Sequence, residues 1–353
     1  MRKVIVPAFL NELWPLGWSF AVFVLATSVT VVCSVRLASV GDVLADRTGW
    51  GEAFFGAVLF GLVTSMSGIV MTAVSAASDQ PQLAYSNAVG GIAAQTVAIA
   101  IADAFHRDAN LEHAAASLQN MMFGCLLIVL LGIALMATFS PDVTVLGVHP
   151  ASVAMVALYW GGLRLIRGQG SPMWRAVRTT DTLADVPDSD DGDEAVTSHS
   201  TRRLWTEFAA AAVLVAVSGW AVAHAAEGLM EHTGLSAGLV GAVFMGVVNA
   251  LPETITSIAA VRRGAVTLAI AAIIGGNCLD ALNLVVGDLA YGGGSLFHAA
   301  SPQELFLTSG SLVMTAVLLS GLLVRQRANW LRVGFDGVLL LAVYFGIVTV
   351  LAL

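Results

Sequence analysis

The stretch Gly56-Ala57-Val58-Leu59-Phe60-Gly61 recurs 185 residues later as Gly241-Ala242-Val243-Phe244-Met245-Gly246. Without a gap, the same shift carries Leu83-Ala84 onto Leu268-Ala269, Gly90-Gly91 onto Gly275-Gly276, and Asp103 onto Asp288. Each long apolar run of the first half also falls on one in the second half. Solenoids repeat every ~20 to 50 residues. One duplication of half a chain is instead typical of secondary transporters, whose substrate sites lie where the halves meet.

The composition indicates a membrane protein. Of the 353 residues, 57% are hydrophobic and only 11% are charged, whereas a soluble domain carries about 25% charged residues. Ten nearly charge-free runs each approach the ~20 residues that a helix needs to cross a bilayer. They cover 16–35, 53–77, 83–102, 114–141, 143–163, 208–226, 233–261, 265–290, 305–324 and 333–353. None shows the alternation of membrane-barrel strands, so we expect an all-α integral membrane protein with ten transmembrane helices.

The first run pairs with 208–226 under the 185-residue shift, so we interpret it as a helix rather than a cleaved signal peptide. If the N-terminus lies outside, 14 of the 16 basic residues fall in inner loops, and only Arg2 and Lys3 disagree. Lys and Arg accumulate in cytoplasmic loops. The sequence thus predicts a multi-pass protein of the cell membrane with an external N-terminus. Because five spans is an odd number, the two halves form inverted five-helix repeats.

The longest polar stretch divides the chain. We expect a first repeat over 1–167 (helices 1–5), a cytoplasmic acidic linker over 168–204, and a second repeat over 205–353 (helices 6–10). The acidic run that begins at Asp188 resembles a calcium loop, but an EF-hand needs an acid twelve positions along, where this chain has His199. A solvated linker is the better interpretation.

Two acids fall well inside apolar runs. Glu253 follows Pro252 in the seventh run, and Asp280 lies midway along the eighth. A carboxylate at the bilayer centre costs at least about 2.5–3.5 kcal/mol, so such acids are functional by default. Pro252 removes a backbone donor and disfavours helix at Leu251. We therefore expect a broken helix there, whose freed carbonyls line a cavity or bind something.

Oxygen ligands surround Glu253 in the sequence, from Asn249, Thr256 and Ser257. Hard cations such as Ca²⁺ and Na⁺ prefer such ligands. The other interpretation of Glu253 is a protonated structural acid. Asp103 and Asp288 are equivalent under the repeat, but each lies near the end of its run, which favours an interfacial or capping role.

The stretch Asn249-Ala250-Leu251-Pro252-Glu253-Thr254-Ile255-Thr256-Ser257 resembles the G-(T/N)-(S/A)-L-P-E-x-x-T-S signature of the cation/calcium antiporter superfamily, the sodium/calcium exchangers and their relatives. The segment 269–280 is similar to that family's A-(I/V)-G-N-x-x-G-S-N-x-x-(N/D). The resemblance implies the family's ten-helix inverted-repeat fold, with Glu253 and Asp280 as cation ligands and Asn249 supplying further oxygen.

The first repeat departs from this pattern. Glu253 corresponds to Gly68 and Asp280 to Gln95 under the shift. Thr64 and Ser65 stand where the family has Thr-Ser, and Gln95 keeps an amide oxygen where the family often has Asn. The resemblance therefore implies Thr64, Ser65 and Gln95 as the ligands from this half. With two central acids, the ionised site carries a charge of about −2, which one divalent or two monovalent cations would neutralise.

These observations predict a secondary-active antiporter that exchanges Ca²⁺, or a similar cation, for Na⁺ or H⁺ by alternating access. The alternatives are a monovalent Na⁺/H⁺ exchanger and a degenerate, non-transporting membrane protein that acts as an ion sensor or scaffold. No covalent chemistry is implied, so we do not expect an enzyme. We expect no cofactor and no nucleic-acid partner; the partners are inorganic cations and the lipid bilayer, and the sequence makes no prediction of the oligomeric state.

Overall fold

The computed structural model describes residues 13–48, 65–104, 110–115, 117–145, 147–168, 198–262, 266–326 and 334–353. In the first half these form α1 (Leu16–Thr48), α4 (Met66–Ala77), α5 (Pro81–Asp103), α6 (Leu111–Ala114), α7 (Leu118–Ala137) and α8 (Pro150–Arg167). The second half forms α10 (Thr201–Thr233), α11 (Ala237–Leu239), the π-helical η3 (Val240–Met245), α12 (Gly246–Arg262), α13 (Val266–Asp280), α14 (Asn283–Ala290), α15 (Pro302–Val324) and α16 (Phe335–Ala352). The described residues are thus helical apart from their connections.

The duplication is visible in the helix bounds themselves. Helices α1 and α10 both have 33 residues, and α10 begins and ends 185 positions after α1. Helices α8 and α16 both have 18 residues and obey the same shift. Helix α4 ends at Ala77, and α12 ends 185 positions later at Arg262. The two halves therefore repeat in structure as they do in sequence.

The expected ten spans agree with the helices. Among the described residues, eight helical segments are long and apolar enough to cross a membrane, including the combined segments Ala237–Arg262 and Ala269–Ala290. The other two expected spans, 53–77 and 143–163, correspond to α4 and α8. Helix α4 is a shorter apolar helix, and the part of 53–77 before Ser65 lies outside the described residues. The structure thus confirms an all-helical membrane fold built from two repeats.

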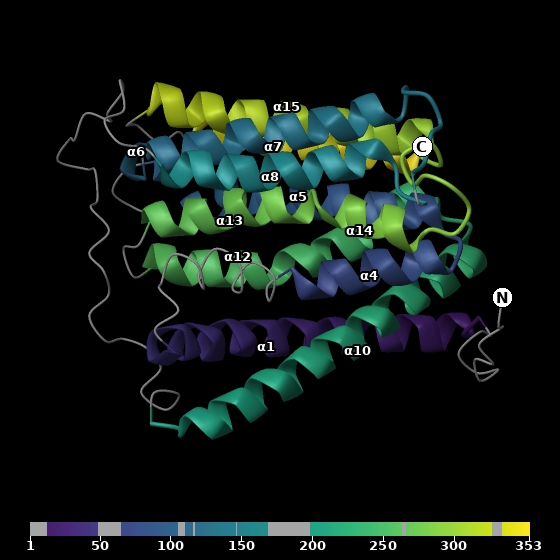
Figure 1. Ribbon diagram of the computed structural model, residues 1–353, viewed down its shortest axis with the longest axis horizontal. Helices are drawn as coiled ribbons and strands as arrows, with labels where there is room; N and C mark the ends of the chain where they lie inside the picture. The colour runs from purple at the N-terminus through teal and green to yellow at the C-terminus, as the bar shows by residue number, and fades with distance from the viewer. Residues whose placement is uncertain are drawn as a thin grey trace.

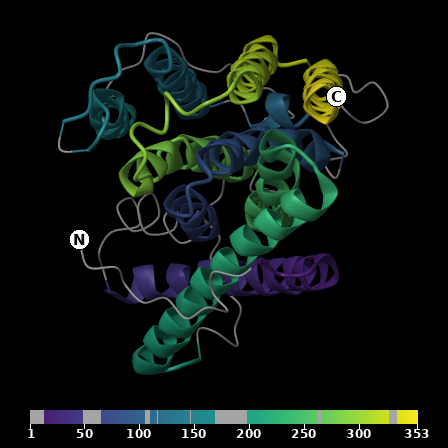
Figure 2. The same ribbon diagram turned by 90° about the vertical axis from the view of Figure 1, so that its right-hand side faces the viewer.

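Helix α5 is the centre of the bundle, with 94% of its apolar window buried. It contacts α4, η3, α12, α13, α15 and α16. By contrast, α1 packs mainly against its repeat partner α10, and only 22% of its apolar window is buried. Figure 1 shows α10 crossing α1 obliquely, and the end-on view of Figure 2 shows the pair at one side of the remaining helices. The fold therefore consists of a packed core and a flanking α1–α10 pair.

Helix α5 meets η3 and α12 backbone to backbone. A Cβ at Gly90 would overlap the backbone of Ala242, and a Cβ at Gly246 would overlap the backbone of Gly90. Gly241 faces α5 as well, beside Ser86. Gly241 lies within η3 and Gly246 directly follows it, and the two are five residues apart, which is the hydrogen-bond spacing of a π-helix. The π turn thus places both glycines against α5, so the two halves approach closely at the middle of the molecule.

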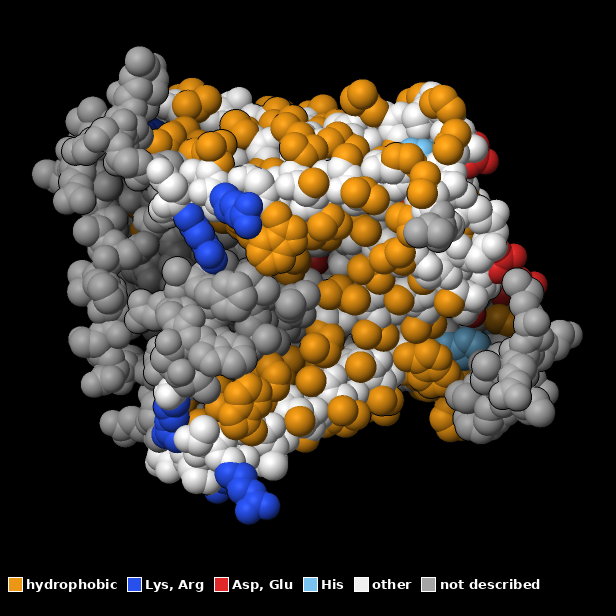
Figure 3. Space-filling model, viewed as in Figure 1, with side chains coloured by type: hydrophobic (Ala, Val, Ile, Leu, Met, Phe, Trp, Pro, Cys, Tyr) orange, Lys and Arg blue, Asp and Glu red, His pale blue; other side chains and the backbone are white. Residues whose placement is uncertain are grey.

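Arginines gather at one end of the bundle, which we call the arginine-rich end. They lie at helix termini there: Arg47, Arg164, Arg167, Arg202, Arg203, Arg262 and Arg325. Figure 3 shows Lys and Arg side chains at this end on the left, acidic side chains at the opposite end, and a mainly apolar surface between them. Helix α1 begins and α16 ends at the opposite end (Figure 1).

The expected helix break was misplaced. Helix α12 runs without interruption through Pro252, so the expected break there is wrong. Hydroxyl groups bind the carbonyls around the proline, Thr254 donating to Ala250 O and Thr256 to Pro252 O, which is how membrane helices tolerate proline. The interruption falls instead at Ala281-Leu282, between α13 and α14 and directly after Asp280.

The linker boundary also differs. Helix α10 begins at Thr201, capped by the Ser200 hydroxyl, inside the interval 168–204 expected to be linker. Most of that interval, 169–197, lies outside the described residues.

Candidate cation site

The fully buried Asp280 carboxylate is the centre of the candidate site. Gln95 Nε2 donates to its Oδ2 at 2.6 Å, and Asn249 Nδ2 donates to the same oxygen at 3.2 Å. Asn283 Nδ2 donates to Oδ1 at 3.3 Å. Gln95 belongs to the first repeat and the other two to the second. The structure therefore brings three of the predicted site residues, Asp280, Gln95 and Asn249, into one hydrogen-bonded group from both halves of the chain.

The second acid, Glu253, lies on α12 and is 3% exposed. A Cβ at Gly276 of α13 would lie 3.5 Å from Gln95 Oε1 and 4.0 Å from Glu253 Cγ. Gly276 is one helical turn before Asp280. Glu253 therefore borders the same buried region as Asp280 and Gln95, and two carboxyl groups and a carboxamide meet between α5, α12 and α13.

Asn249 occupies the place of the missing first-repeat acid. A Cβ at Gly68 of α4 would overlap the Asn249 amide, and a Cβ at Gly91 of α5 would lie 2.5 Å from Asn249 Nδ2. The amide is thus held in a slot that two glycines leave open. The 185-residue shift pairs Gly68 with Glu253, and the structure shows that a side chain of the second repeat fills the space beside Gly68. Residue 68 is a glycine because the Asn249 side chain lies against it.

Several oxygens of this region are available for further interactions. Gln95 Oε1 and Asn249 Oδ1 are buried and have no hydrogen-bond partner among the residues that the structure describes. The Ser65 hydroxyl lies at the start of α4, beside the Asp280 carboxylate. The remaining predicted ligand, Thr64, lies outside the described residues. Buried polar atoms are normally paired, so the two amide oxygens indicate a site built for an additional binding partner.

The oxygen atoms fit a hard cation. Within the described ranges, no three His, Cys, Asp or Glu side chains lie close enough together to hold a metal ion. A cation at Glu253 and Asp280 would therefore take its other ligands from amide and hydroxyl oxygens. Thr256 and Ser257, which the sequence also placed near Glu253, donate to backbone carbonyls instead, Ser257 to Ala269 O.

Sequence reasoning missed Asn283. It lies three residues after Asp280, and positions three apart share a helix face, so that spacing was the available signal. Asn87 of α5 was missed as well. It donates to Thr72 Oγ1 at 2.9 Å and to Gly68 O at 3.3 Å, and so holds α4 against α5 where Asn249 enters.

Asp103 and Asp288 have the capping role that the sequence favoured. Asp288 Oδ1 accepts from Leu296 N at 3.0 Å and Oδ2 from His149 N at 2.8 Å. Asp103 Oδ1 accepts from Leu111 N at 2.7 Å and Oδ2 from Gly334 N at 3.0 Å. These two sets of contacts are related by the 185-residue shift. Each aspartate caps the last helix of the other repeat, α8 or α16, and neither belongs to the candidate cation site.

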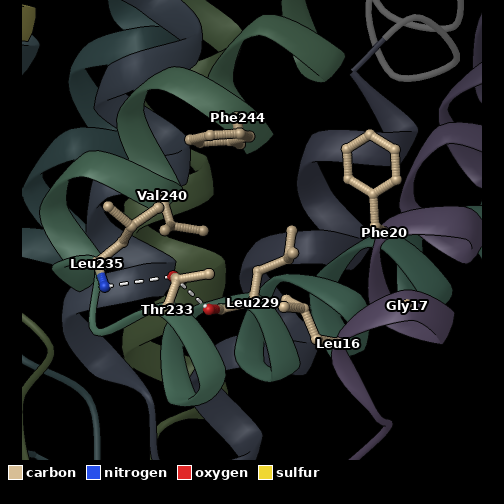
Figure 4. Close-up of a pocket in the computed structure, with 8 residues that line it drawn as sticks. All are labelled: Leu16, Gly17, Phe20, Leu229, Thr233, Leu235, Val240 and Phe244. Atoms are coloured by element: carbon tan, nitrogen blue, oxygen red, sulfur yellow. Dashed lines mark hydrogen bonds between the residues drawn. The ribbon is translucent and has the colours of Figure 1, made fainter.

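A separate pocket lies between α1, α10 and η3, toward the end opposite the arginines (Figure 4). It has a volume of about 470 Å³, and its lining comprises Leu16, Gly17, Phe20, Leu229, Thr233, Leu235, Val240 and Phe244. The single hydroxyl, on Thr233, donates to Leu229 O. This apolar pocket has no charged ligand, so it is not the cation site.

Comparison with known families agrees with this architecture. A family model described as sodium/calcium exchanger protein matches residues 18–166 and 204–353. The chain belongs to the sodium/calcium exchanger family. The first matched segment covers most of α1 to α8 and the second most of α10 to α16, and the unmatched interval between them contains the acidic run.

Several solved structures share the fold of this family member. The H⁺/Ca²⁺ exchanger CAX has a TM-score of 0.66 at 15% identity, with 98% of this chain and 87% of that chain covered. YfkE has a TM-score of 0.63 at 15% identity, covering 96% and 93%. The sodium–calcium exchanger NCX_Mj has a TM-score of 0.59 at 14% identity, covering 95% and 98%. At these identities the likeness shows the fold alone. No curated protein sequence matches the chain.

Proposed function

We propose that this protein is a secondary-active antiporter that exchanges Ca²⁺, or a similar cation, for Na⁺ or H⁺. The observation that carries the proposal is the buried carboxylate Asp280, held by amides from both repeats, with Glu253 beside the same region. Membership of the sodium/calcium exchanger family supports a cation cargo. No covalent step is part of the proposal, so the protein is a transporter rather than an enzyme and uses no cofactor.

The electrostatics of the site favour exchange over simple leakage. Glu253 and Asp280 are 3% and 0% exposed, and moving carboxylates out of water costs several kcal/mol per ion. The charged site is therefore costly to move through the protein while empty. Ca²⁺, Na⁺ ions or protons neutralise the same two carboxylates and compete for them. The cations compete for one site, and the change between outward and inward access costs free energy when that site is empty. The movement of one cation is therefore coupled to that of another.

The arrangement of helices supplies an element that could move. The α1–α10 pair packs on α4, η3 and α12 rather than within the core. Alternating access would come from this pair moving against the core around a fixed cation site. We place the protein in the cell membrane with the arginine-rich end and the 168–204 linker in the cytoplasm and the N-terminus outside, because basic residues accumulate on the inner side.

Purified protein in proteoliposomes tests the function. We expect uptake of ⁴⁵Ca²⁺ driven by an outward Na⁺ gradient or a pH gradient. Glu253→Gln and Asp280→Asn should each abolish it, because an amide keeps the shape but loses the charge. Asp142→Asn is the matched control, since its side chain is 68% exposed. Na⁺/H⁺ exchange without Ca²⁺ movement would replace the proposal with the monovalent alternative, and no cation flux at all would favour the sensor or scaffold.

A further inference from the structure

A second group of buried acids lies at the arginine-rich end, far along α5 from the cation site. Asp103 ends α5, Glu112 lies in the short α6, and Asp336 lies in the first turn of α16. Their exposures are only 1%, 2% and 2%. Asn110, which precedes α6, is 1% exposed and lies beside Gly334. Three carboxyl groups are therefore removed from water within one small region.

Within the described part of the chain, the three acids differ in their hydrogen-bond partners. Asp103 uses both oxygens on the backbone N–H groups of Leu111 and Gly334. Glu112 Oε1 and Oε2, Asp336 Oδ2 and Asn110 Oδ1 have no hydrogen-bond partner in the described part of the chain. The Glu112 and Asp336 carboxyl groups lie within hydrogen-bonding reach of each other. If one of them is protonated, its O–H can donate a hydrogen bond to the other. Gly321 of α15 leaves room for the Asp336 carboxyl, because a Cβ there would overlap it.

The two repeats allow a comparison that tests whether the fold itself requires Glu112 and Asp336. At the opposite end Asp288 makes the same caps as Asp103, yet the positions equivalent to Glu112 and Asp336 are Phe297 and Ala151. One architecture is thus built twice, once with two extra acids and once without them. The cap does not need the extra acids, so the burial of these two carboxyl groups indicates another role.

Among the described residues, the basic side chains nearest the pair contact backbone carbonyl groups. His113 Nδ1 contacts Arg325 O at 2.7 Å, and the Arg325 guanidinium donates to His113 O at 3.0 Å. Helix α13 has no charged residue before Asp280, and α7 has none along its length. Among the described residues, the titratable and charged groups close to Glu112 are therefore Asp103, His113, Arg325 and Asp336.

A bound proton or a bound cation could remove the repulsion between the two acids. A metal ion fits poorly, because Asp103 has both oxygens occupied and no three acidic or imidazole side chains in the described ranges lie close enough together. We propose that Glu112 and Asp336 form a second proton-binding site, in which the two carboxyl groups share one proton and thereby hold α6 against α16. Burial and the carboxylates of Asp336 and Asp103 raise the pKa of Glu112 well above its usual range.

The consequence is a contact that depends on the pH at the arginine-rich end. With the proton bound, one carboxyl donates to the other across the α6–α16 contact. When the proton leaves to solvent, two facing carboxylates repel each other in a medium of low dielectric. A group whose pKa is raised in the folded state binds more protons there than in the unfolded chain, so its stabilisation declines as the pH rises through the raised value.

Hydrogen exchange on the full chain in lipid nanodiscs tests this proposal. We compare α6 and the first turn of α16 at about pH 6 and pH 9, with chelator present and intrinsic rates corrected. Protection in the wild type should fall roughly tenfold or more, since one proton contributes up to tenfold per pH unit. Glu112→Gln should remain protected at both pH values because its amide still donates. Glu231→Gln, an exposed glutamate on α10, should behave as wild type.

The same pH response in Glu112→Gln as in the wild type would overturn the proposal. Recovery of protection at high pH on adding Ca²⁺ would also overturn it, because the pair would then be a cation site. Asp336→Asn provides an independent variant if Glu112→Gln does not fold, with the same expectation. The response should persist in Glu253→Gln, so its outcome is separate from that of the proposed transport function.

Discussion

Gln95 and Asp280 are equivalent positions of the two repeats, and they hydrogen-bond to each other at 2.6 Å. Two equivalent residues touch only where the axis that relates the repeats passes between them. The candidate site therefore lies on the internal symmetry axis, yet its chemistry is unequal, with a carboxylate on one side and an amide on the other. The amide donates where a second acid would repel, so this asymmetry stabilises a single buried charge.

Replacing Gln95 by leucine should weaken cation binding. The change removes a donor from the Asp280 carboxylate at a buried position, and hydrogen bonds to charged groups contribute about 1.5–3 kcal/mol. We expect the cation concentration for half-maximal flux, measured in proteoliposomes, to increase by roughly ten- to a hundredfold. Gln119→Leu, on an exposed position of α7, is the control. Equal half-saturation in both variants would show that the cross-repeat bond has no part in binding.

Gly68→Ala should impair flux because its Cβ would overlap the Asn249 amide. In an Asn249→Ala background the same change should cost little, since the space is then free. Such non-additivity is expected of residues in contact, and flux in the four combinations measures it. Gly275→Ala should be tolerated, because a Cβ there meets nothing within 4 Å. Additive effects of the two changes would contradict the contact.

Asp288→Ala should destabilise the protein without changing the cation site. The carboxylate accepts from His149 N, Leu296 N and the Ser152 hydroxyl at 2.7 Å. Each buried donor left unpaired costs about 1–3 kcal/mol, so the free energy of unfolding should fall by several kcal/mol. Thermal denaturation in detergent measures this, with Asp142→Ala as the control. A melting temperature equal to that of the wild type would refute the capping role.

The proposed orientation predicts which side each connection faces. In a background without Cys33, Cys125 and Cys278, the variant Asp190→Cys should react with impermeant maleimide only after the membrane is opened. Asp79→Cys and Gly293→Cys should react from outside in intact cells. Labelling of position 190 from outside would reverse the orientation.

Two central carboxylates predict electroneutral exchange of one divalent for two monovalent cations. A third monovalent ion would leave an uncompensated charge in the interior, at a cost of several kcal/mol. An electrogenic cycle would instead respond to voltage by about 2.3 kcal/mol per charge per 100 mV. Imposing a potential with K⁺ and valinomycin should leave the equilibrium Ca²⁺ gradient unchanged in proteoliposomes. A gradient that follows the potential would rule out this stoichiometry.

The helices could be predicted from the sequence because the duplication presents each of them twice, once in each repeat. The shift that paired Gln95 with Asp280 also anticipated the capping pair, Asp103 and Asp288. Local rules failed where tertiary packing decides. Pro252 signalled a break, but hydroxyl groups and close neighbours keep α12 continuous. The observed break at Ala281-Leu282 contains no glycine or proline, so no helix-breaking residue predicted it. Long-range neighbours such as Glu112 and Asp336 had no local signal at all.

The reciprocal caps bear on how the molecule must be assembled. The start of α8 is completed by Asp288 from the second half, and the start of α16 by Asp103 from the first. Neither half alone carries the group that finishes its own final helix. Two separately synthesised halves would each remain incomplete until they met, and each would then supply what the other lacks. In its capping hydrogen bonds, the protein therefore resembles a dimer of two interdependent halves that are joined in one polypeptide.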